Sequence, residues 1–172
     1  MDETNNKSLI RLRDAFASLL ITRSINKITV QDVVRKAEIN RSTFYRYFLD
    51  LNDFIDWLDS DMITEITNLV KLNDDQRIDF TEFYRYAIKN RSLLKGLLES
   101  KRWQDFVDHL FKIVSKNYVE LLKKQSHSIP IEIQSQFFIG GNINLFKWWL
   151  SQSDQPSPEI MAKYHEMLST PQ

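Results

Sequence analysis

The sequence has 172 residues, of which 42% are hydrophobic and 27% charged, a composition that is ordinary for a soluble globular protein. It contains no cysteine, which excludes disulfides, thiolate metal ligands and a cysteine nucleophile. The formal net charge is zero, but residues 1–50 contain nine Lys or Arg against six Asp or Glu, whereas residues 51–172 contain fourteen against seventeen. This division suits a nucleic-acid-binding N-terminal part joined to a body with another role.

Turn-forming residues are scarce. Only 3 Gly and 4 Pro interrupt the chain, which favours an all-helical fold over a sandwich or a barrel. No stretch approaches the roughly 18 apolar residues that a membrane-spanning helix needs. The N-terminal segment is polar and then charged, and it lacks the apolar core of a signal peptide. We therefore predict a cytoplasmic, all-α protein without a membrane partner.

Three helices are predicted within the first fifty residues. The first spans residues 5–24 and carries apolar side chains at helical spacing, namely Leu9, Leu12, Phe16, Leu19 and Leu20. After a short break, Thr29 begins the second helix, and Asp32 three positions later completes a capping box. Asn40 is the expected cap of a short third helix that ends at Tyr47.

Six further helices are predicted after the first fifty residues. In chain order we expect a helix of about 20 residues after a polar joint at 50–53, a polar loop at 71–76, a helix capped by Asp79 with Glu82, a short helix at 90–99, a long helix at 103–122, a helix from near Pro130 to about residue 151, and a last helix whose cap is Ser157. The prediction is an all-α fold of about nine helices, with a three-helix head at 1–50 and a larger helical body at 51–172.

The second and third predicted helices have the pattern of a helix-turn-helix. They are short, apolar on their inner faces and separated by about three residues. The second helix of such a pair enters the major groove, so its outward side chains should be small hydrogen-bonding groups and cations, while Phe44 and Phe48 point inward at i, i+4 spacing. The candidate DNA-binding residues are Asn40, Arg41, Ser42, Thr43, Tyr45, Arg46 and Tyr47. A three-helix bundle without a DNA role fits the same spacing.

These residues resemble a known family. Ile28-Thr29-Val30-Gln31-Asp32-Val33-Val34, then Ala37, then Ser42-Thr43-Phe44-Tyr45-Arg46-Tyr47-Phe48 resembles the N-terminal signature of TetR/AcrR-type transcriptional regulators. The resemblance implies that Thr29 binds a DNA phosphate through its hydroxyl and amide, and that residues 41–43 face bases or nearby phosphates. It also implies that Tyr45 and Tyr47 donate to phosphates and that Arg46 reaches a phosphate or a base edge.

Two positions depart from the family pattern. The turn between the two helices usually has Gly where this chain has Glu38, which fits if that residue need not adopt a positive φ. Its charge would lie near the DNA. The family often has Lys at the start of the fourth helix, where this chain has Leu51. Losing that phosphate contact should lower the salt dependence of binding by about one counterion.

The eighth and ninth predicted helices are the candidate dimer interface. One helix-turn-helix reads few base pairs, and a dimer places two recognition helices about 34 Å apart on a palindrome. Two glycines inside an apolar helix cost up to about 1 kcal/mol each, which the close approach of a partner helix would offset. The predicted interface residues are Gly140, Gly141, Asn144, Leu145, Trp148 and Trp149, with Phe137 beside them. The resemblance, which extends to the last helices of a subgroup common in Gram-positive bacteria, implies a four-helix interface. A kinked helix buried within one chain is the alternative.

Aromatic residues of the body are candidates for an effector pocket, because most relatives enclose a ligand between their fourth and seventh helices. The candidates are Trp57, Phe83, Tyr84, Tyr86, Trp103, Phe106 and Phe137. An aromatic stripe at helical spacing also fits a plain core, and no charged residue stands out as an anchor for a ligand.

Catalysis has little support in the sequence. Asp105 and His109 fall on one helical face, but a metal site needs a third ligand, and no phosphate-binding loop or nucleophile elbow occurs. We therefore predict a protein that is not an enzyme and needs no cofactor or metal. The predicted function is a transcriptional regulator, a repressor in its simplest form, that binds a palindromic DNA operator as a homodimer and is released by a small-molecule effector. The alternative is a co-regulator of the same fold whose body binds a partner protein.

Overall fold

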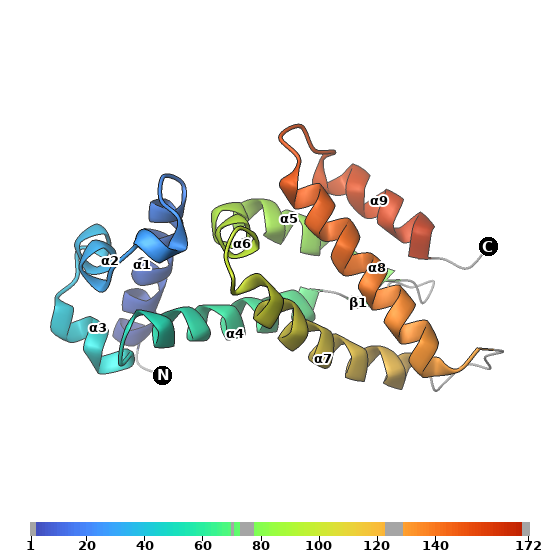
Figure 1. Ribbon diagram of the computed structural model, residues 1–172, viewed down its shortest axis with the longest axis horizontal. Coiled ribbons are helices and arrows are strands. Elements are labelled where there is room, and N and C mark those ends of the chain that lie inside the picture. The colour runs from blue at the N-terminus through green and yellow to red at the C-terminus, as the bar shows by residue number, and fades with distance from the viewer. Residues whose placement is uncertain (1–2, 70, 73–77, 123–128, 170–172) are drawn as a thin grey trace. The chain divides into compact units, whose positions relative to one another are not determined.

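A computed structural model describes residues 3–69, 71–72, 78–122 and 129–169 of the chain (Figure 1). The N-terminal elements are α1 (Glu3–Leu20), the 3-10 helix η1 (Ile25–Lys27), α2 (Val30–Ala37), α3 (Arg41–Tyr47) and α4 (Leu51–Leu69). They are followed by β1 (Lys71–Leu72), β2 (Ile78–Asp79), α5 (Thr81–Lys89), α6 (Arg91–Leu98), α7 (Trp103–Leu122), α8 (Ile131–Ser151) and α9 (Pro158–Ser169). Within the described residues the predicted helical fold is confirmed, and β1 and β2 add one short antiparallel pairing.

Two predicted boundaries are wrong. The sequence predicts a first helix to residue 24, whereas α1 ends at Leu20, because the amides of Thr22 and Arg23 both close onto the carbonyl of Leu19. Asp79 is predicted to cap the fifth helix but lies in β2, where its carboxylate accepts the Thr81 amide at 2.8 Å. The predicted loop at 71–76 begins with β1, and its remainder lies outside the described residues.

The chain forms two compact units, and each unit is made of two separate segments of the sequence. The first contains residues 1–62 and 90–101, and the second contains residues 63–89 and 102–172. The first unit therefore includes α1 to α3, most of α4 and the distant α6. The predicted division into a DNA-binding domain at 1–50 and a ligand-binding and dimerisation domain at 51–172 concerns function and stays a prediction.

An aromatic cluster forms the core of the first unit around α3. Phe44 is fully buried, and its ring lies 5.4 Å from that of Phe48 and 5.8 Å from that of Phe54 on α4. Phe54 also meets the edge of Phe16 from α1 at 5.4 Å. These contacts fix the inner face of α3 against two longer helices, so its outer face is held in a defined orientation.

The sixth helix joins the first unit through close packing on α1. A Cβ atom placed on Gly96 would lie 2.9 Å from both δ carbons of Leu20, which is closer than carbon atoms normally approach. Arg13 of α1 adds a polar tie, because its guanidinium donates to Asp61 at 2.7 Å and to Asn90 at 3.1 Å. The N-terminal helices are thus braced by chain that follows them by about seventy residues.

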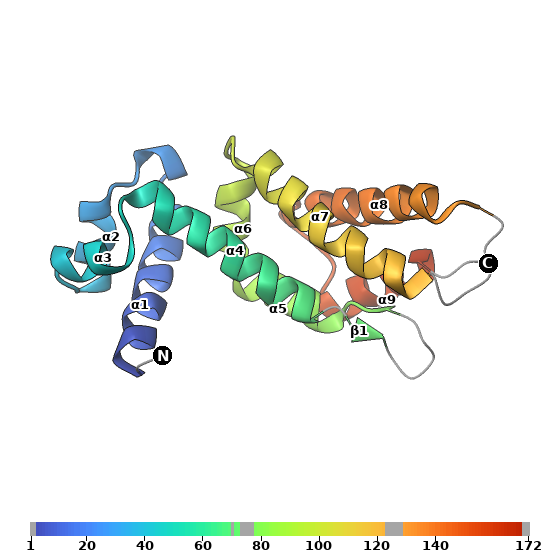
Figure 2. The same cartoon turned by 90° about the horizontal axis from the view of Figure 1, so that it is seen from below.

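The second unit is built on helix pairs α5 with α9 and α7 with α8, and the latter pair lies side by side in both views (Figures 1 and 2). Its core contains a polar chain in which the Tyr84 hydroxyl is hydrogen-bonded to Nδ1 of His165 at 2.9 Å. The other ring nitrogen of His165 lies 2.7 Å from Oδ1 of Asn142, so α5, α8 and α9 meet at one imidazole. Within the described residues no helix has the length and apolar character needed to cross a membrane.

Candidate nucleic-acid interface

The capping box at the start of α2 forms as the sequence predicts. The Thr29 hydroxyl accepts the Asp32 amide at 3.2 Å, and the Asp32 carboxylate accepts the Thr29 amide at 3.1 Å. The Thr29 hydroxyl also donates to that carboxylate at 2.7 Å. Both groups that the resemblance assigns to a DNA phosphate are therefore engaged with Asp32 in the unbound chain.

Two arginines extend this cluster. Nη1 of Arg23 lies 3.0 Å from the Asp32 carboxylate, and Nη2 of Arg35 lies 3.2 Å from the same oxygen. The Thr29 hydroxyl and amide, followed by Arg23, hold the pKa of Asp32 below its usual range. The carboxylate is therefore ionised wherever the protein is folded near neutral pH, and it stays a permanent partner for both cations.

The third helix presents its polar residues outward. Asn40, Arg41, Ser42, Tyr45 and Arg46 are exposed, and Thr43 and Tyr47 are partly exposed. Asn40 occupies the N-cap position but, contrary to prediction, its side chain makes no capping hydrogen bond. The Asn40 side chain therefore does not cap the N-terminus of α3.

Each arginine of α3 lies over a tyrosine ring. Arg41 donates to the hydroxyl of Tyr45 at 3.0 Å, and its guanidinium lies 5.3 Å from the ring centre. Arg46 makes the same pair of contacts with Tyr47, at 2.9 and 5.0 Å. Because the Tyr45 oxygen accepts a hydrogen bond from Arg41, its own O–H can donate to another acceptor, such as a phosphate oxygen.

The turn between α2 and α3 contains strained backbone. Glu38 has φ 52° and ψ 47°, so the condition under which the sequence accommodates Glu, namely that this residue avoids positive φ, is not met. The turn requires that conformation because the amide of Ile39 donates to the carbonyl of Val34 at 3.1 Å, in the manner of a Schellman turn. Arg11 offsets part of the strain by donating to the Glu38 carbonyl at 3.1 Å and pairing with its carboxylate at 3.4 Å.

The start of α4 carries acids where the family often has a lysine. Asp50 accepts the Asp53 amide at 3.0 Å, and Asp53 accepts the Leu49 amide at 2.8 Å. Leu51 is partly buried and has no charge to offer. Two carboxylates therefore lie beside the position at which the family often has a lysine.

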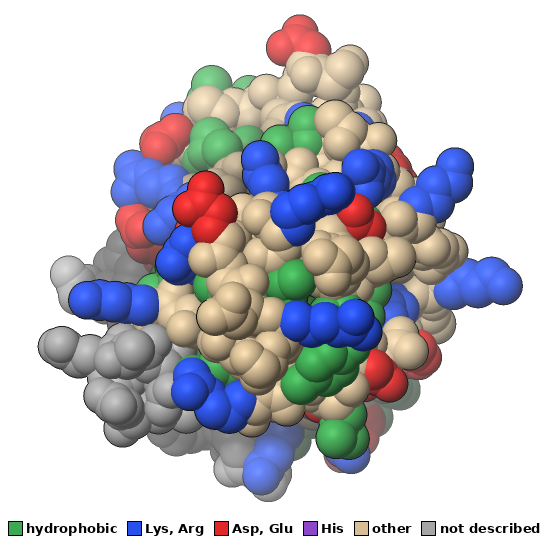
Figure 3. Space-filling view, turned by 90° about the vertical axis from the view of Figure 1, so that its left-hand side faces the viewer, with side chains coloured by type: hydrophobic (Ala, Val, Ile, Leu, Met, Phe, Trp, Pro, Cys, Tyr) green, Lys and Arg blue, Asp and Glu red, His purple; other side chains and the backbone are tan. Residues whose placement is uncertain are grey.

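The face of the molecule that carries α1 to α3 has Lys and Arg side chains spread across it, with fewer acidic ones between them (Figure 3). This distribution agrees with the basic balance of residues 1–50. A helix with outward hydrogen-bonding groups on a mildly basic face is the arrangement that a helix-turn-helix offers to DNA.

Comparison with known proteins identifies the family. A family model described as "Bacterial regulatory proteins, tetR family" matches residues 12–50, and one described as "Transcriptional regulator C-terminal region" matches residues 74–170, which is more than half of the chain. The chain belongs to the TetR family. It is a transcriptional regulator whose α2 and α3 form the DNA-binding helix-turn-helix of that family.

Individual relatives agree with this membership. The HTH-type dhaKLM operon transcriptional activator DhaS of Lactococcus lactis subsp. lactis (strain IL1403) is 27% identical over 104 residues, covering 60% of this chain and 48% of DhaS. The match thus spans about half the length of that relative. A TetR transcriptional regulator from Streptococcus agalactiae 2603V matches with a TM-score of 0.60 at 25% identity, covering 98% of this chain and 96% of that one. The fatty acid degradation regulator FadR from Bacillus halodurans has a TM-score of 0.74 at 13% identity over 94% of each chain, which shows a common fold.

The seven aromatic residues that are candidates for an effector pocket of this TetR-family chain have different surroundings. Trp57 belongs to the first unit and packs on Phe48 and Phe54, whereas the other six belong to the second. Phe83 packs on Phe146, and the Tyr86 hydroxyl donates to Glu65 at 2.8 Å. Trp103 stacks on buried Phe106 at 5.9 Å. Phe137 is 85% exposed, so the described residues do not enclose its side chain, and its assignment to a pocket stays a prediction.

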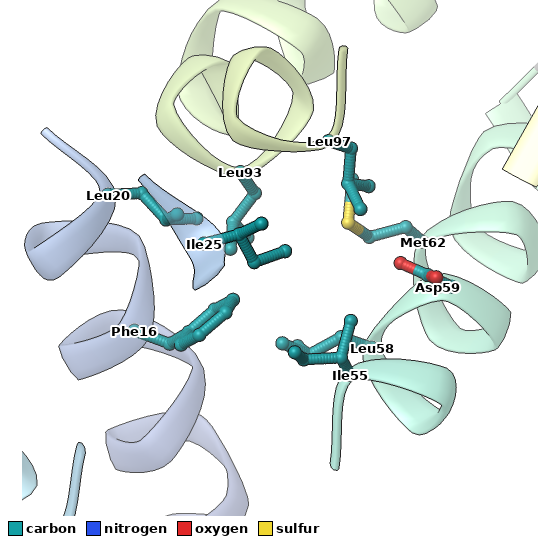
Figure 4. Close-up of a pocket in the computed structure, with 9 residues that line it drawn as sticks. All are labelled: Phe16, Leu20, Ile25, Ile55, Leu58, Asp59, Met62, Leu93 and Leu97. Carbon is teal, nitrogen blue, oxygen red and sulfur yellow. The ribbon is translucent and has the colours of Figure 1, made fainter. Parts of the chain in front are cut away.

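A small cavity lies within the first unit, among α1, η1, α4 and α6 (Figure 4). Its lining consists of Phe16, Leu20, Ile25, Ile55, Leu58, Asp59, Met62, Leu93 and Leu97. The free volume is about 10 Å³, which is room for one water molecule and too little for an organic effector. None of the predicted pocket residues lines this cavity.

The predicted dimer residues on α8 fall into two groups. Gly140, Gly141, Asn144 and Trp148 are exposed and Leu145 is partly exposed, so a partner can reach them. Trp149 is fully buried, with its ring 4.8 Å from that of Tyr84 and its N–H donating to the carbonyl of Pro156 at 3.0 Å. Its assignment to the interface is therefore wrong, because it belongs to the core of its own unit.

Sequence reasoning misses three cations of the helix-turn-helix face. Arg35 follows Asp32 at i, i+3 spacing, a signal that was available in the sequence. The contacts of Arg23 with Asp32 and of Arg11 with Glu38 depend on the packing of α1 beside α2, and local spacing gives no sign of them.

Proposed function

We propose that this regulator binds a palindromic operator as a homodimer, inserts α3 into the major groove, and acts as a repressor released by a small ligand. The observation that carries the proposal is the outward polar face of α3, backed by the buried rings of Phe44 and Phe48. A helix fixed on its inner side by aromatic packing keeps its outer side chains in register with a groove, which sequence-specific binding requires.

The residues on that face suit the chemistry of base edges and phosphates. Arg41 can donate two hydrogen bonds to the major-groove edge of guanine, and the side-chain amide of Asn40 suits adenine. Tyr45 suits a phosphate oxygen, because its hydroxyl keeps its proton while accepting from Arg41, and Tyr47 offers the same type of group beside Arg46. Thr29 would contact phosphate only after exchanging its bonds to Asp32.

Dimerisation through α8 and α9 is supported by apolar side chains that the single chain leaves exposed. On α8 these are Ile133, Phe137 and Trp148, and on α9 they are Ile160, Tyr164, Met167 and Leu168. A Cβ atom on Gly140 or Gly141 would meet nothing within 4 Å, so the single chain gains no packing from these glycines. A partner helix that approaches closely would explain why an otherwise unfavourable pair of residues lies inside a helix.

Ligand control would pass through α4, which begins in the first unit and ends in the second. A ligand held among helices of the second unit would shift this helix and change the spacing of the two α3 helices in the dimer. Such coupling is reciprocal, so a ligand that weakens operator binding must itself bind more weakly to the DNA complex.

The name of one relative favours a second candidate function. DhaS is a transcriptional activator, which agrees with a co-regulator whose body binds a partner protein. In that case the exposed residues of α8 or α9 would contact the partner, and DNA binding by the chain alone would be weak.

A mobility-shift titration with the DNA upstream of the chain's own gene tests the proposal. We expect the dimeric protein to shift this duplex at low salt, and an Arg41→Ala, Tyr45→Phe double variant to weaken the shift. Lys112→Ala, which removes an exposed cation from α7, serves as the control and should change nothing. Failure of the unsubstituted protein to bind any DNA at low salt would contradict the repressor and favour the co-regulator.

A further inference from the structure

Three charged groups around the start of α2 form a cluster with an ordered arrangement. The Asp32 side chain is 16% exposed, whereas those of Arg23 and Arg35 are 42% and 70% exposed. The Asp32 carboxylate thus lies closer to the protein interior, and the side chains of Arg23 and Arg35 extend from it toward solvent. Although the cluster contains an acid, the charge it presents outward is positive.

Both guanidinium groups keep donors for another anion. Each contacts Asp32 through one terminal nitrogen, and a guanidinium has five N–H donors in a fixed plane. Asp32 is also tied to the backbone and hydroxyl of Thr29, so its own position is fixed by the capping box. A fixed carboxylate that holds two arginines from one side lowers the freedom that they must lose when they bind a second anion from the other side.

We infer that Arg23 and Arg35 contact the DNA backbone and that Asp32 is the positioning residue that aims them. The inference rests on the proposed function and extends it to residues that lie outside α3. The first helix of a helix-turn-helix crosses the phosphate backbone, and Arg23 precedes this helix while Arg35 lies on it. The ligand is the duplex phosphate backbone and not the bases, because neither residue lies on the groove-entering helix.

This role predicts that one substitution changes DNA affinity in the direction opposite to the one expected from charge alone. Removing an acid from a DNA-binding face normally strengthens binding, because repulsion with phosphates is lost. Asp32→Asn should instead weaken it, since both arginines lose the charge that orders them. Glu38→Gln is the matched control, because it also removes an acid from the helix-turn-helix. The Glu38 carboxylate makes only a 3.4 Å contact with Arg11. That control should leave binding unchanged or strengthen it.

The experiment measures fluorescence anisotropy of a random-sequence duplex over a series of NaCl concentrations. We expect Arg23→Gln and Arg35→Gln each to reduce the slope of log K against log salt by about one. Asp32→Asn should reduce both the affinity and the slope. A partly unfolded variant loses affinity by one factor at every salt concentration and keeps the slope, so structural damage is distinguished from loss of phosphate contacts. Arg85→Gln is the cation control, because Arg85 pairs with Glu82 and Glu159 in the second unit.

The outcomes separate the inference from the proposed function. Unchanged slopes in both arginine variants would overturn the backbone contacts while leaving operator binding by α3 intact. Reduced slopes together with tighter binding by Asp32→Asn would overturn the positioning role of Asp32. An unsubstituted protein that binds no duplex at any salt concentration would overturn the proposed function, and the inference with it.

Discussion

The outer faces of α3 and α8 differ in chemistry although both are backed by buried aromatic rings. Outward residues of α3 are arginines, tyrosines and small polar groups, and Phe44 anchors the helix from behind. Outward residues of α8 include Ile133, Phe137 and Trp148, and Trp149 anchors that helix in the same way. Exposure alone therefore does not distinguish the two surfaces, but the side chains that are exposed do.

This contrast indicates two kinds of partner. A polyanion is attracted by the cations of α2 and α3, whereas an apolar helix face gains free energy only when another apolar surface removes it from water. The two surfaces lie in different compact units, so each can be perturbed through its own core. Damage to one core should therefore affect one surface and spare the other.

Phe44→Ala should have the largest effect, on the first unit. The ring is fully buried among Phe48, Phe54 and Tyr45, and truncation of such a residue costs about 3–5 kcal/mol of unfolding free energy. We expect loss of DNA binding in anisotropy titrations, with a fall of that size in urea unfolding followed by circular dichroism. The dimer mass in sedimentation should persist, and its loss would show that the two surfaces are not independent.

Acid should damage the second unit through His165. Burial lowers the pKa of this imidazole from 6.5 to about 4, so the unfolded chain binds a proton between these values that the folded chain does not. Stability from the neutral ring is complete above pH 6.5 and declines as the pH falls toward 4. At pH 4 this shift in pKa corresponds to a loss of about 3 kcal/mol in the free energy of unfolding.

The measurement for His165 is the free energy of unfolding from urea titrations across that pH range. His165→Gln should be less stable at pH 7, because the tie between Tyr84 and Asn142 is weakened, yet it should lose most of the dependence between pH 6.5 and 4. An unchanged pH dependence in that variant would assign the effect to other groups.

Local signals in the sequence predict much of the fold. The Thr29 capping box fixes the start of α2, and Ser157 followed by Pro158 fixes that of α9, because capping depends on residues within one turn. The inward direction of Phe44 and Phe48 follows equally from their i, i+4 spacing. Each of these features is settled by neighbours along the chain.

The sequence predictions fail where contacts between residues that are distant in the chain determine the structure. Trp148 and Trp149 are adjacent, so a helix directs them about 100° apart, but only the position of α5 determines which of them is buried. Glu38 adopts positive φ because the turn needs it, and Arg11 from α1 contributes to holding it there. Arg23 joins the nucleic-acid interface through a contact with Asp32 that no local spacing encodes.

Phe137→Asp tests the apolar surface. A charge in the centre of a buried interface should cost at least about 2 kcal/mol of association free energy, or roughly 30-fold in the dimer dissociation constant. Sedimentation at several protein concentrations would reveal the monomer. The matched control is Ile21→Asp, at an apolar side chain of similar exposure in the first unit, which should leave the dimer intact. Equal effects of the two variants would argue against an interface on α8.

Glu38→Gly should have the smallest effect, and it sharpens the contrast between the two surfaces by removing an acid from the nucleic-acid interface. Gly adopts φ 52° without the steric penalty that Glu suffers, whereas it gains more conformational freedom in the unfolded chain. The balance should be a gain of about 0.5–1 kcal/mol in unfolding free energy. Glu38→Gln removes the charge but keeps the strain, so it should not share this gain. Equal stability of the two variants would mean that the exposed contact with Arg11, and not the backbone, determines the energy of this turn.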